Sequence, residues 1–379
     1  MSTRGLEGIV VAETQLSKIY GEQGRLLYRG YEIEDLAEHT SFEEVCHLLW
    51  YGELPDRRQL DALRAGFAEA AAVDPGVIDI LRRLPKGGHP MATLRTLVSA
   101  LSAYDPEAED MSPEANHRKA VRLTAKLPTL TAAIERVRQG KDPIAPRPEL
   151  GLAANFLYML HGEEPAELPG RIMDVAFILH AEHGMNASTF SARVTVATLS
   201  DMHSAVVSAI GTLKGPLHGG ANERVMRMLK AIGEPDRAAA WIRDALGRKE
   251  RIMGFGHRVY RALDPRAPIL KRLAEELAAQ GGPAENRWLE ISERVEQVMA
   301  EEMKARGKPI YPNVDFFSAS VYYTLGIPPD LFTNVFASAR VAGWTAHIME
   351  QLADNRLIRP KAEYVGPEGK KVRPIEARG

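Results

Sequence analysis

The chain is poor in cysteine, and this scarcity excludes two kinds of structure. Cys46 is the only cysteine among 379 residues, so no intrachain disulfide can form. A zinc site built on several thiolates is excluded for the same reason. Cys46 lies in an apolar, helix-compatible run at residues 45–50, a position typical of a buried structural thiol rather than a nucleophile.

Charge of one sign and long apolar runs are also lacking. The net charge is −2 and the isoelectric point is about 6.6, which argues against indiscriminate attraction to nucleic acid or to an anionic membrane. No apolar run is long enough to cross a bilayer, and residues 1–7 carry charges without the apolar core of a secretory signal. We therefore expect a soluble cytoplasmic protein with no nucleic-acid or membrane partner, although a local basic cluster can still bind a polyanionic ligand.

Length and helical patterning are what the chain does have. With 379 residues and 45% hydrophobic content, it can bury a large core and form more than one domain. A capping box that begins at Ser41 predicts a helix ending near Gly52. Ser112 opens another helix, which Pro128 should kink or split before Gly140 closes it. Further helical patterns cover residues 170–182, 187–199, 202–214, 222–232, 237–248, 267–280, 286–306 and 329–353.

Alternating apolar runs are scarce by comparison. The best candidate strand covers residues 8–12, and its hairpin partner is expected near residues 26–28. The patterns together predict a mainly α fold with minor β structure near the N-terminus.

Four loops between the helices combine residues suited to chemistry, and the first covers residues 180–188. His180 and His183 are three apart and flank Glu182, so on one helical face they would suit a metal. The spacing is not that of a His-Glu-x-x-His zinc site, and Gly184 is expected to end the helix beside His183. Structural histidines and a polar ligand-binding turn therefore stay open as alternatives.

The second loop, at residues 213–222, surrounds His218 with three glycines and a proline. Small residues let a ligand approach the backbone, and the helix that follows would present its N-terminus to negative charge. The loop matches no nucleotide-binding fingerprint. A tight turn with an incidental histidine is the alternative.

The third loop, at residues 253–266, places His257 after a Gly-Phe-Gly segment and before Arg258, Arg261 and Arg266. Arginine side chains offer paired donors to carboxylates or phosphates, so the loop predicts an anion site. A solvated run of charges is the alternative.

The fourth loop, at residues 308–317, places Asp315 between Val314 and Phe316. Apolar neighbours disfavour the ionised carboxylate and raise its basicity. Asp315 is equally compatible with an N-cap of the helix expected to follow.

Together these motifs resemble the citrate synthase family. The resemblance rests on residues 215–222, 254–260 with 264–266, and 312–315, and it is supported by residues 180–183, 336–340 and 355–361. Their order and spacing match the short bacterial and archaeal form over almost the whole chain. One such motif would be weak, whereas six in order are specific.

The resemblance implies a homodimer of helical protomers that acts on small molecules. A large domain would combine residues 1–219 and 327–379, a small domain would be the insertion at residues 220–326, and the active site would lie between them. The resemblance implies no metal and no cofactor, because the CoA thioester is itself a substrate.

The resemblance also implies roles for single residues. Asp315 would remove a proton from the acetyl group, His218 would stabilise the thioester oxygen, and His257 would donate to the ketone of oxaloacetate. The implied oxaloacetate ligands are His183, Arg266, Arg340 and, from the neighbouring protomer, Arg359. The implied CoA contacts are Phe255, Gly256, Arg261, Arg306 and Lys308.

Three alternatives stay open at this point. A 2-methylcitrate synthase would use propionyl-CoA with the same catalytic residues. A metal-dependent hydrolase would use His180, His183 and Asp315. A non-catalytic helical scaffold gives no reason for two glycine-flanked histidines and an aspartate in this order.

Overall fold

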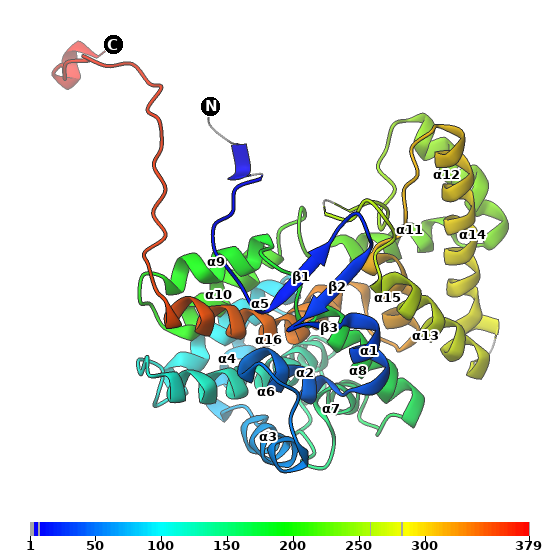
Figure 1. Cartoon of the computed structure of the whole chain (residues 1–379), viewed down its shortest axis with the longest axis horizontal. Helices are drawn as coiled ribbons and strands as arrows, with labels where there is room; N and C mark the ends of the chain where they lie inside the picture. Colours follow the sequence, from blue (N-terminus) through cyan, green and yellow to red (C-terminus); the bar gives the residue numbers. More distant parts are fainter. Residues whose placement is uncertain (1–3, 7, 258, 282, 379) are drawn as a thin grey trace.

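The computed structural model describes residues 4–6, 8–257, 259–281 and 283–378, and it is mainly helical, as the sequence predicted (Figure 1). The α-helices are α1 (Ile33–His39), α2 (Phe42–Tyr51), α3 (Arg57–Ala70), α4 (Pro75–Arg83), α5 (Pro90–Leu101), α6 (Pro113–Arg138), α7 (Leu152–His161), α8 (Glu167–Ala181), α9 (Ala187–Val196), α10 (Met202–Leu213), α11 (Ala221–Ile232), α12 (Ala238–Gly247), α13 (Arg266–Gln280), α14 (Pro283–Ala305), α15 (Val314–Thr324) and α16 (Phe332–Ala353). The strands are β1 (Ser17–Tyr20), β2 (Arg25–Tyr28) and β3 (Tyr31–Glu32), and the short 3-10 helices are η1 (Arg4–Leu6), η2 (Ser102–Tyr104), η3 (Pro235–Arg237), η4 (Pro329–Leu331) and η5 (Ile375–Ala377).

Local signals explain several of these helices. The capping box at Ser41 is confirmed: the hydroxyl of Ser41 accepts from the backbone N–H of Glu44, whose carboxylate accepts from the N–H of Ser41. Gly52 ends α2 in the left-handed conformation, and Cys46 is buried within that helix. The predicted split at Pro128 is wrong, because α6 continues through this buried proline. Packing of α6 against α7 and α16 outweighs the one backbone bond that proline removes.

The strand prediction was half right. Residues 26–28 do form the core of β2, but their antiparallel partner is β1, paired from Ser17 with Tyr28 to Tyr20 with Arg25. The predicted strand at residues 8–12 is wrong, since this segment is irregular and Val10 is 86% exposed. A tight turn at residues 21–24 selects the nearer partner, because a short connection brings β1 back along β2.

Helix α16 is central to the core and packs against α6, α8 and α9 (Figure 1). Helices α11, α12, α13 and α14 lie together on the right of that view, and α15 packs against α11, α13 and α14. The loops that precede α9, α11, α13 and α15 carry most of the residues singled out in the sequence. These four helices therefore bring distant parts of the chain to one region.

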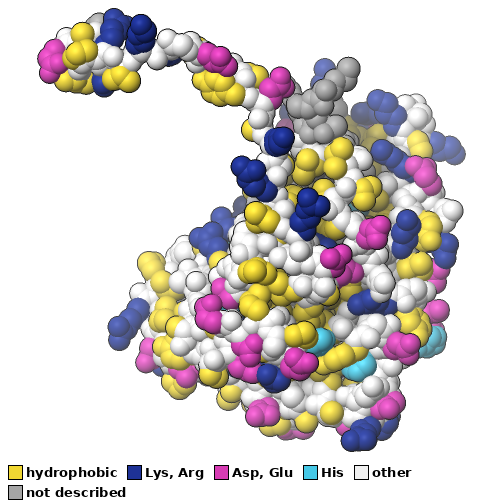
Figure 2. Space-filling view, turned by 60° about the vertical axis from the view of Figure 1, so that its left-hand side comes forward, with side chains coloured by type: hydrophobic (Ala, Val, Ile, Leu, Met, Phe, Trp, Pro, Cys, Tyr) yellow, Lys and Arg dark blue, Asp and Glu magenta, His cyan; other side chains and the backbone are white. Residues whose placement is uncertain are grey.

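The C-terminal segment leaves this core. After α16, residues 354–378 form no helix or strand apart from η5, and both Figure 1 and Figure 2 show the end of this segment standing clear of the body. Arg359 is exposed where this arm departs, and it lines a groove of about 1260 Å³ together with Trp50, Phe190 and the end of α16. Within the described residues, no helix has both the length and the apolar character needed to span a membrane.

Candidate active site

The loop after α8 places His183 in the interior. Helix α8 ends at Ala181, so His183 lies beyond it and is only 9% exposed. The Nε2 atom of His183 lies 3.2 Å from the Tyr260 hydroxyl, and the ring centroid lies 5.3 Å from that of His257. Burial, with the nearby Arg266 guanidinium second, lowers the pKa of His183 well below its usual range. His183 is therefore neutral at neutral pH.

The loop before α13 fixes one nitrogen of His257. The backbone N–H groups of Val259 and Tyr260 donate to its Nδ1 atom at 3.0 and 3.2 Å. A nitrogen that accepts carries no proton, so the neutral ring has its proton on Nε2. Burial lowers the pKa of His257 to about 4, and the positive charge of Arg266 adds to this effect while Asp264 opposes it. The ring is thus a neutral donor through Nε2.

The His257 loop is fastened to the loop that carries Asp315. The backbone N–H of Asn313 donates to the carbonyl of Gly254, and its side-chain amide donates to the carbonyl of Gly256, both at 2.9 Å. The rings of Phe255 and Phe316 pack 4.7 Å apart between centroids. Gly254 has a φ of +81°, and a Cβ atom there would lie 2.8 Å from Phe316. Only glycine permits this close approach.

Asp315 lies in the first turn of α15, and the suggestion that it caps this helix is wrong. Asn313 is the N-cap, since its side-chain oxygen accepts from the N–H of Asp315 at 3.1 Å. The carboxyl group of Asp315 therefore does not serve as the N-cap of α15. Burial raises the pKa of this group to about 6, Arg266 opposes the rise, and the negative charge of Asp264 adds to it.

Arg266 and Asp264 form a buried two-bond ion pair. The Nε and Nη2 atoms of Arg266 lie 2.9 and 2.7 Å from the two oxygens of Asp264. Burial alone would raise the pKa of Asp264, but the guanidinium more than offsets this and the pKa is lowered. Asp264 also accepts from the N–H of Val314 at 3.2 Å. The pair therefore joins the start of α13 to the start of α15.

Arg340, on α16, is buried without such a partner. Its Nε atom donates to the carbonyl of His180 at 2.6 Å, and its guanidinium lies 4.7 Å from the ring centroid of Phe336. Across the described part of the chain, its terminal nitrogens make no hydrogen bond or ion pair. Burial lowers the pKa of Arg340 to about 10, opposed first by the negative charge of Glu182. The side chain remains a cation with donors to spare.

His218 joins this framework through the start of α9. The backbone N–H of Ser188 donates to the Nε2 atom of His218 at 3.3 Å, and the Ser188 hydroxyl lies 2.8 Å from the same atom. The buried indole of Trp344 donates to this hydroxyl at 3.1 Å. Because Nε2 accepts, the proton of a neutral His218 ring is on Nδ1. The ring thus contacts the N-terminus of α9.

The remaining predicted residues lie further out. Arg261 is exposed, and its backbone N–H donates to the carbonyl of Gly21 at 2.9 Å, which rests the loop on the turn between β1 and β2. Arg306 is exposed and lies 3.7 Å from Glu302, and Lys308 is exposed. Arg258 falls outside the described residues. The geometry thus brings together His183, His257, Arg266, Arg340 and Asp315, with His218 attached through α9.

Three contributors were missed by the sequence reasoning. Ser188 contacts His218, Tyr260 contacts His183, and Asp264 pairs with Arg266. Asp264 gave a usable signal, since an aspartate two residues before a buried arginine is a natural partner. Ser188 gave none, because it lies 30 residues before the histidine that it contacts.

The ligand set of a metal-dependent hydrolase is not assembled. Within the described ranges, no group of three or more histidine, cysteine, aspartate or glutamate side chains is placed to hold one ion. The Nδ1 atom of His180 instead bonds the carbonyl of Ala176 at 2.7 Å, inside α8.

Comparisons with known proteins show which family the chain resembles. The family model described as citrate synthase, C-terminal domain, matches residues 5–361. Citrate synthase 2 of Bacillus subtilis is 51% identical over 378 residues, covering 100% of this chain and 99% of that protein. A 2-methylcitrate synthase of Mycobacterium tuberculosis is 47% identical over 365 residues, covering 96% and 91%. The solved citrate synthase of Thermoplasma acidophilum, in a ternary complex with carboxymethyl coenzyme A and oxaloacetate, superposes with a TM-score of 0.94 at 34% identity, covering 100% of both chains.

The helical fold and the matched relatives define an enzyme of the acyltransferase type. The chain belongs to the citrate synthase family.

Proposed function

We propose that the protein is a citrate synthase, which condenses acetyl-CoA with oxaloacetate and water to give citrate and CoA. The observation that carries the proposal is the grouping of two neutral histidines, two buried arginines and an aspartate of raised pKa around one set of loops. Support also comes from relatives named citrate synthase and from the ligands in the Thermoplasma complex.

The proposed chemistry begins with a weak carbon acid. The carboxylate of Asp315 takes a proton from the acetyl methyl group, and Nδ1–H of His218 donates to the thioester oxygen as negative charge gathers there. The enolate carbon then forms a bond to the ketone carbon of oxaloacetate. Nε2–H of His257 donates a hydrogen bond to the ketone oxygen. That oxygen becomes the hydroxyl of citryl-CoA by gaining one proton, which balances the proton that Asp315 removed. Water then cleaves the thioester and releases citrate and CoA.

The proposed oxaloacetate site consists mainly of buried cationic side chains that would bind the two carboxylates. Arg266, Arg340 and His183 would hold the two carboxylates, and Arg359 of the neighbouring protomer would complete the set. Three of these residues are 9% exposed or less, so ionic contacts there are weakly screened. Arg359 is exposed on the arm in a single chain, as expected of a residue that acts on a second protomer.

The domain division and the CoA contacts are part of the same proposal. Residues 220–326 would form the small domain and close over the substrates, bringing Asp315 to the thioester. Phe255 and Gly256 would lie beside the adenine, while Arg261, Arg306 and Lys308 would contact phosphates. No further cofactor is needed, because the thioester carries the reacting group.

A second candidate is 2-methylcitrate synthase, favoured by the relative of that name at 47% identity. The two activities share every catalytic step and differ by one methylene in the acyl group. A hydrophobic pocket discriminates one methylene by only about 1–3 kcal/mol, so preference depends on packing around the acyl chain.

Catalytic efficiency with the two thioesters is the test. We expect kcat/KM for acetyl-CoA to exceed that for propionyl-CoA by about tenfold or more at saturating oxaloacetate, since one methylene is worth about this factor. A higher value for propionyl-CoA would assign the second activity. No condensation with either thioester would overturn the proposal.

The shared site can be tested by subunit mixing. In a mixed dimer of Arg359→Ala and Asp315→Asn chains, one site carries both changes and the other carries neither, provided that each site uses its partner's Arg359. Activity should then recover above that of either variant alone. Verified mixed dimers with no recovery would show that each protomer uses its own Arg359.

A further inference from the structure

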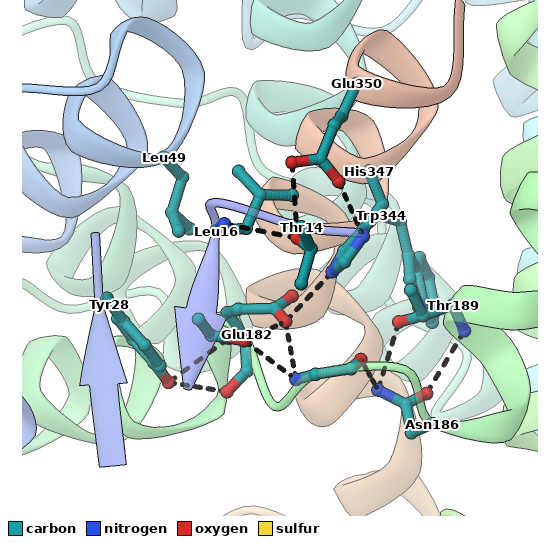
Figure 3. Close-up of polar contacts among 12 residues, drawn as sticks. Thr14, Leu16, Tyr28, Leu49, Glu182, Asn186, Thr189, Trp344, His347 and Glu350 are labelled. Atoms are coloured by element: carbon teal, nitrogen blue, oxygen red, sulfur yellow. Dashed lines mark hydrogen bonds and ion pairs between the residues drawn. The ribbon is translucent and has the colours of Figure 1, made fainter. Parts of the chain in front are cut away.

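Glu182 is a buried carboxylate directly before His183, and the chemistry proposed above does not use it. Its side chain is 0% exposed, and one oxygen, Oε1, accepts three hydrogen bonds (Figure 3). The donors are Nε2 of His347 at 3.0 Å, the hydroxyl of Ser17 at 2.9 Å and the backbone N–H of Gly184 at 2.6 Å. Glu182 thus connects α16 and β1 to the turn that carries His183.

The direction of these bonds is set by Arg193. Its guanidinium donates to Nδ1 of His347 at 3.1 Å, so the neutral ring has its proton on Nε2 and directs it at Glu182. Arg193 also pairs with Glu350 at 2.7 Å, and Glu350 accepts from the N–H of Gln15 at 2.9 Å. The carboxylate of Glu182 is therefore the buried end of a network that runs to the surface at Gln15, with one consistent assignment of donors and acceptors.

The backbone of Glu182 is held as firmly as its side chain. The Tyr28 hydroxyl donates to the Glu182 carbonyl at 2.7 Å and accepts from its N–H at 3.2 Å. The carboxylate reaches forward to the N–H of Gly184, which has a φ of +61°. The residues on both sides of His183 are consequently fixed. Because a ligand is positioned only as precisely as the side chain that holds it, these contacts determine how precisely His183 can hold a ligand.

The second oxygen of the Glu182 carboxylate is not used by the three hydrogen bonds to Oε1. This oxygen, Oε2, is buried and has no hydrogen bond to any residue that the structure describes. It faces Gly343, where a Cβ atom would come within 2.5 Å of it. Burial would raise the pKa of Glu182, yet His347, Arg340 and Ser17 together lower it. Arg340 has no carboxylate in ion-pair contact among the described residues, in contrast to Arg266. Glu182 is thus a longer-range counter-charge for Arg340.

We infer that Glu182 is a positioning residue for oxaloacetate: its buried carboxylate fixes the turn that presents His183 and balances the charge of Arg340. This inference rests on the proposed function, and it assigns Glu182 no contact with substrate.

Glu182→Gln tests the inference, because glutamine keeps the shape and removes the charge. We expect the Kd for oxaloacetate, measured by calorimetry, to rise by about tenfold or more, the factor associated with one buried hydrogen bond to a charged group. Turnover at saturating oxaloacetate should fall less than affinity. Glu43→Gln is the matched control: Glu43 is also a buried carboxylate that accepts a backbone N–H, from Leu152 at 2.8 Å, and it should leave the Kd within about twofold.

Hydrogen exchange of the peptide covering residues 180–190 gives a readout that needs no substrate. Faster exchange in Glu182→Gln than in Glu43→Gln would support the inference, and equal exchange would overturn it. If Glu182→Gln does not fold, Ser17→Ala removes one of the three bonds and should raise the Kd by a few-fold, about the value of one neutral hydrogen bond. An unchanged Kd in a folded Glu182→Gln protein would overturn the inference. A wild-type protein that does not bind oxaloacetate would instead refute the proposed function, while hydrogen exchange would still decide the role of Glu182 in the turn.

Discussion

His218 and His257 have the same side chain but are held by opposite ring nitrogens. The Nε2 atom of His218 accepts from the backbone of Ser188, whereas the Nδ1 atom of His257 accepts from the backbone of Val259 and Tyr260. In its neutral form, each ring therefore carries its proton on the other nitrogen: Nδ1 in His218 and Nε2 in His257. One residue type thus supplies two hydrogen-bond donors at different positions on the ring.

The difference also lies in how the two holding contacts arise. His257 is held by amides two and three residues further along its own loop, so the contact is local. His218 is held by the N-terminus of α9, 30 residues earlier in the chain, so the contact exists only in the folded protein. One tautomer is thus set by a turn and the other by packing.

Loss of the proposed base should have the largest effect, because both histidines act on charge that Asp315 generates. Asp315→Asn is nearly isosteric and removes only basicity, so turnover should fall by at least about 10²-fold. Oxaloacetate affinity, measured by calorimetry, should stay near that of the wild type. Turnover close to normal in the variant would remove Asp315 from the mechanism.

Replacing each histidine by both amides should sharpen the comparison, because the Asn side-chain amide lies near the Nδ1 position and that of Gln near Nε2. Loss of an oxyanion donor costs about 10²–10³-fold, so the amide that restores the donor should retain at least about tenfold more turnover than the other. We predict that His218→Asn exceeds His218→Gln, and that His257→Gln exceeds His257→Asn. The same order at both positions would contradict the opposed tautomers.

The pH dependence separates the base from the histidines. Asp315 acts as a carboxylate and its pKa is raised to about 6, so kcat/KM should fall as pH drops through about 6, approaching tenfold for each further unit. His257 has a pKa of about 4 and should add no change between pH 5 and 8. An acid limb that persists unchanged in the residual activity of Asp315→Asn would assign it to another group.

The smallest predicted effect concerns the Ser188 hydroxyl, which contacts His218. Ser188→Ala removes the hydroxyl but keeps the backbone donor, so turnover should fall by about five- to tenfold, the value of one hydrogen bond near a developing charge. Ser191→Ala is the control, since Ser191 is on the same helix and bonds Ser208 instead. Equal turnover of the two variants would remove the Ser188 hydroxyl from the site.

Local features of this chain were predictable from sequence, and long-range ones were not. The capping box at Ser41 and the mainly helical fold follow from short-range pattern and were confirmed. The split at Pro128 and the strand at residues 8–12 failed, because tertiary packing holds α6 together and a nearer hairpin partner was available.

The candidate site divides in the same way. Its four loops were visible as glycine, histidine and arginine clusters, and the resemblance gave each residue a role. The pairing of Asp264 with Arg266 and the contact of Ser188 with His218 depend on how α9, α13 and α15 meet. The packing of these three helices against their neighbours cannot be predicted from sequence periodicity.

Neutron diffraction from a deuterium-exchanged crystal would test the opposed tautomers most directly, because it locates the exchangeable proton on each ring. We predict deuterium on Nδ1 but not Nε2 of His218, and on Nε2 but not Nδ1 of His257, at neutral pH. Deuterium on the same nitrogen of both rings, or on both nitrogens of either ring, would contradict the account.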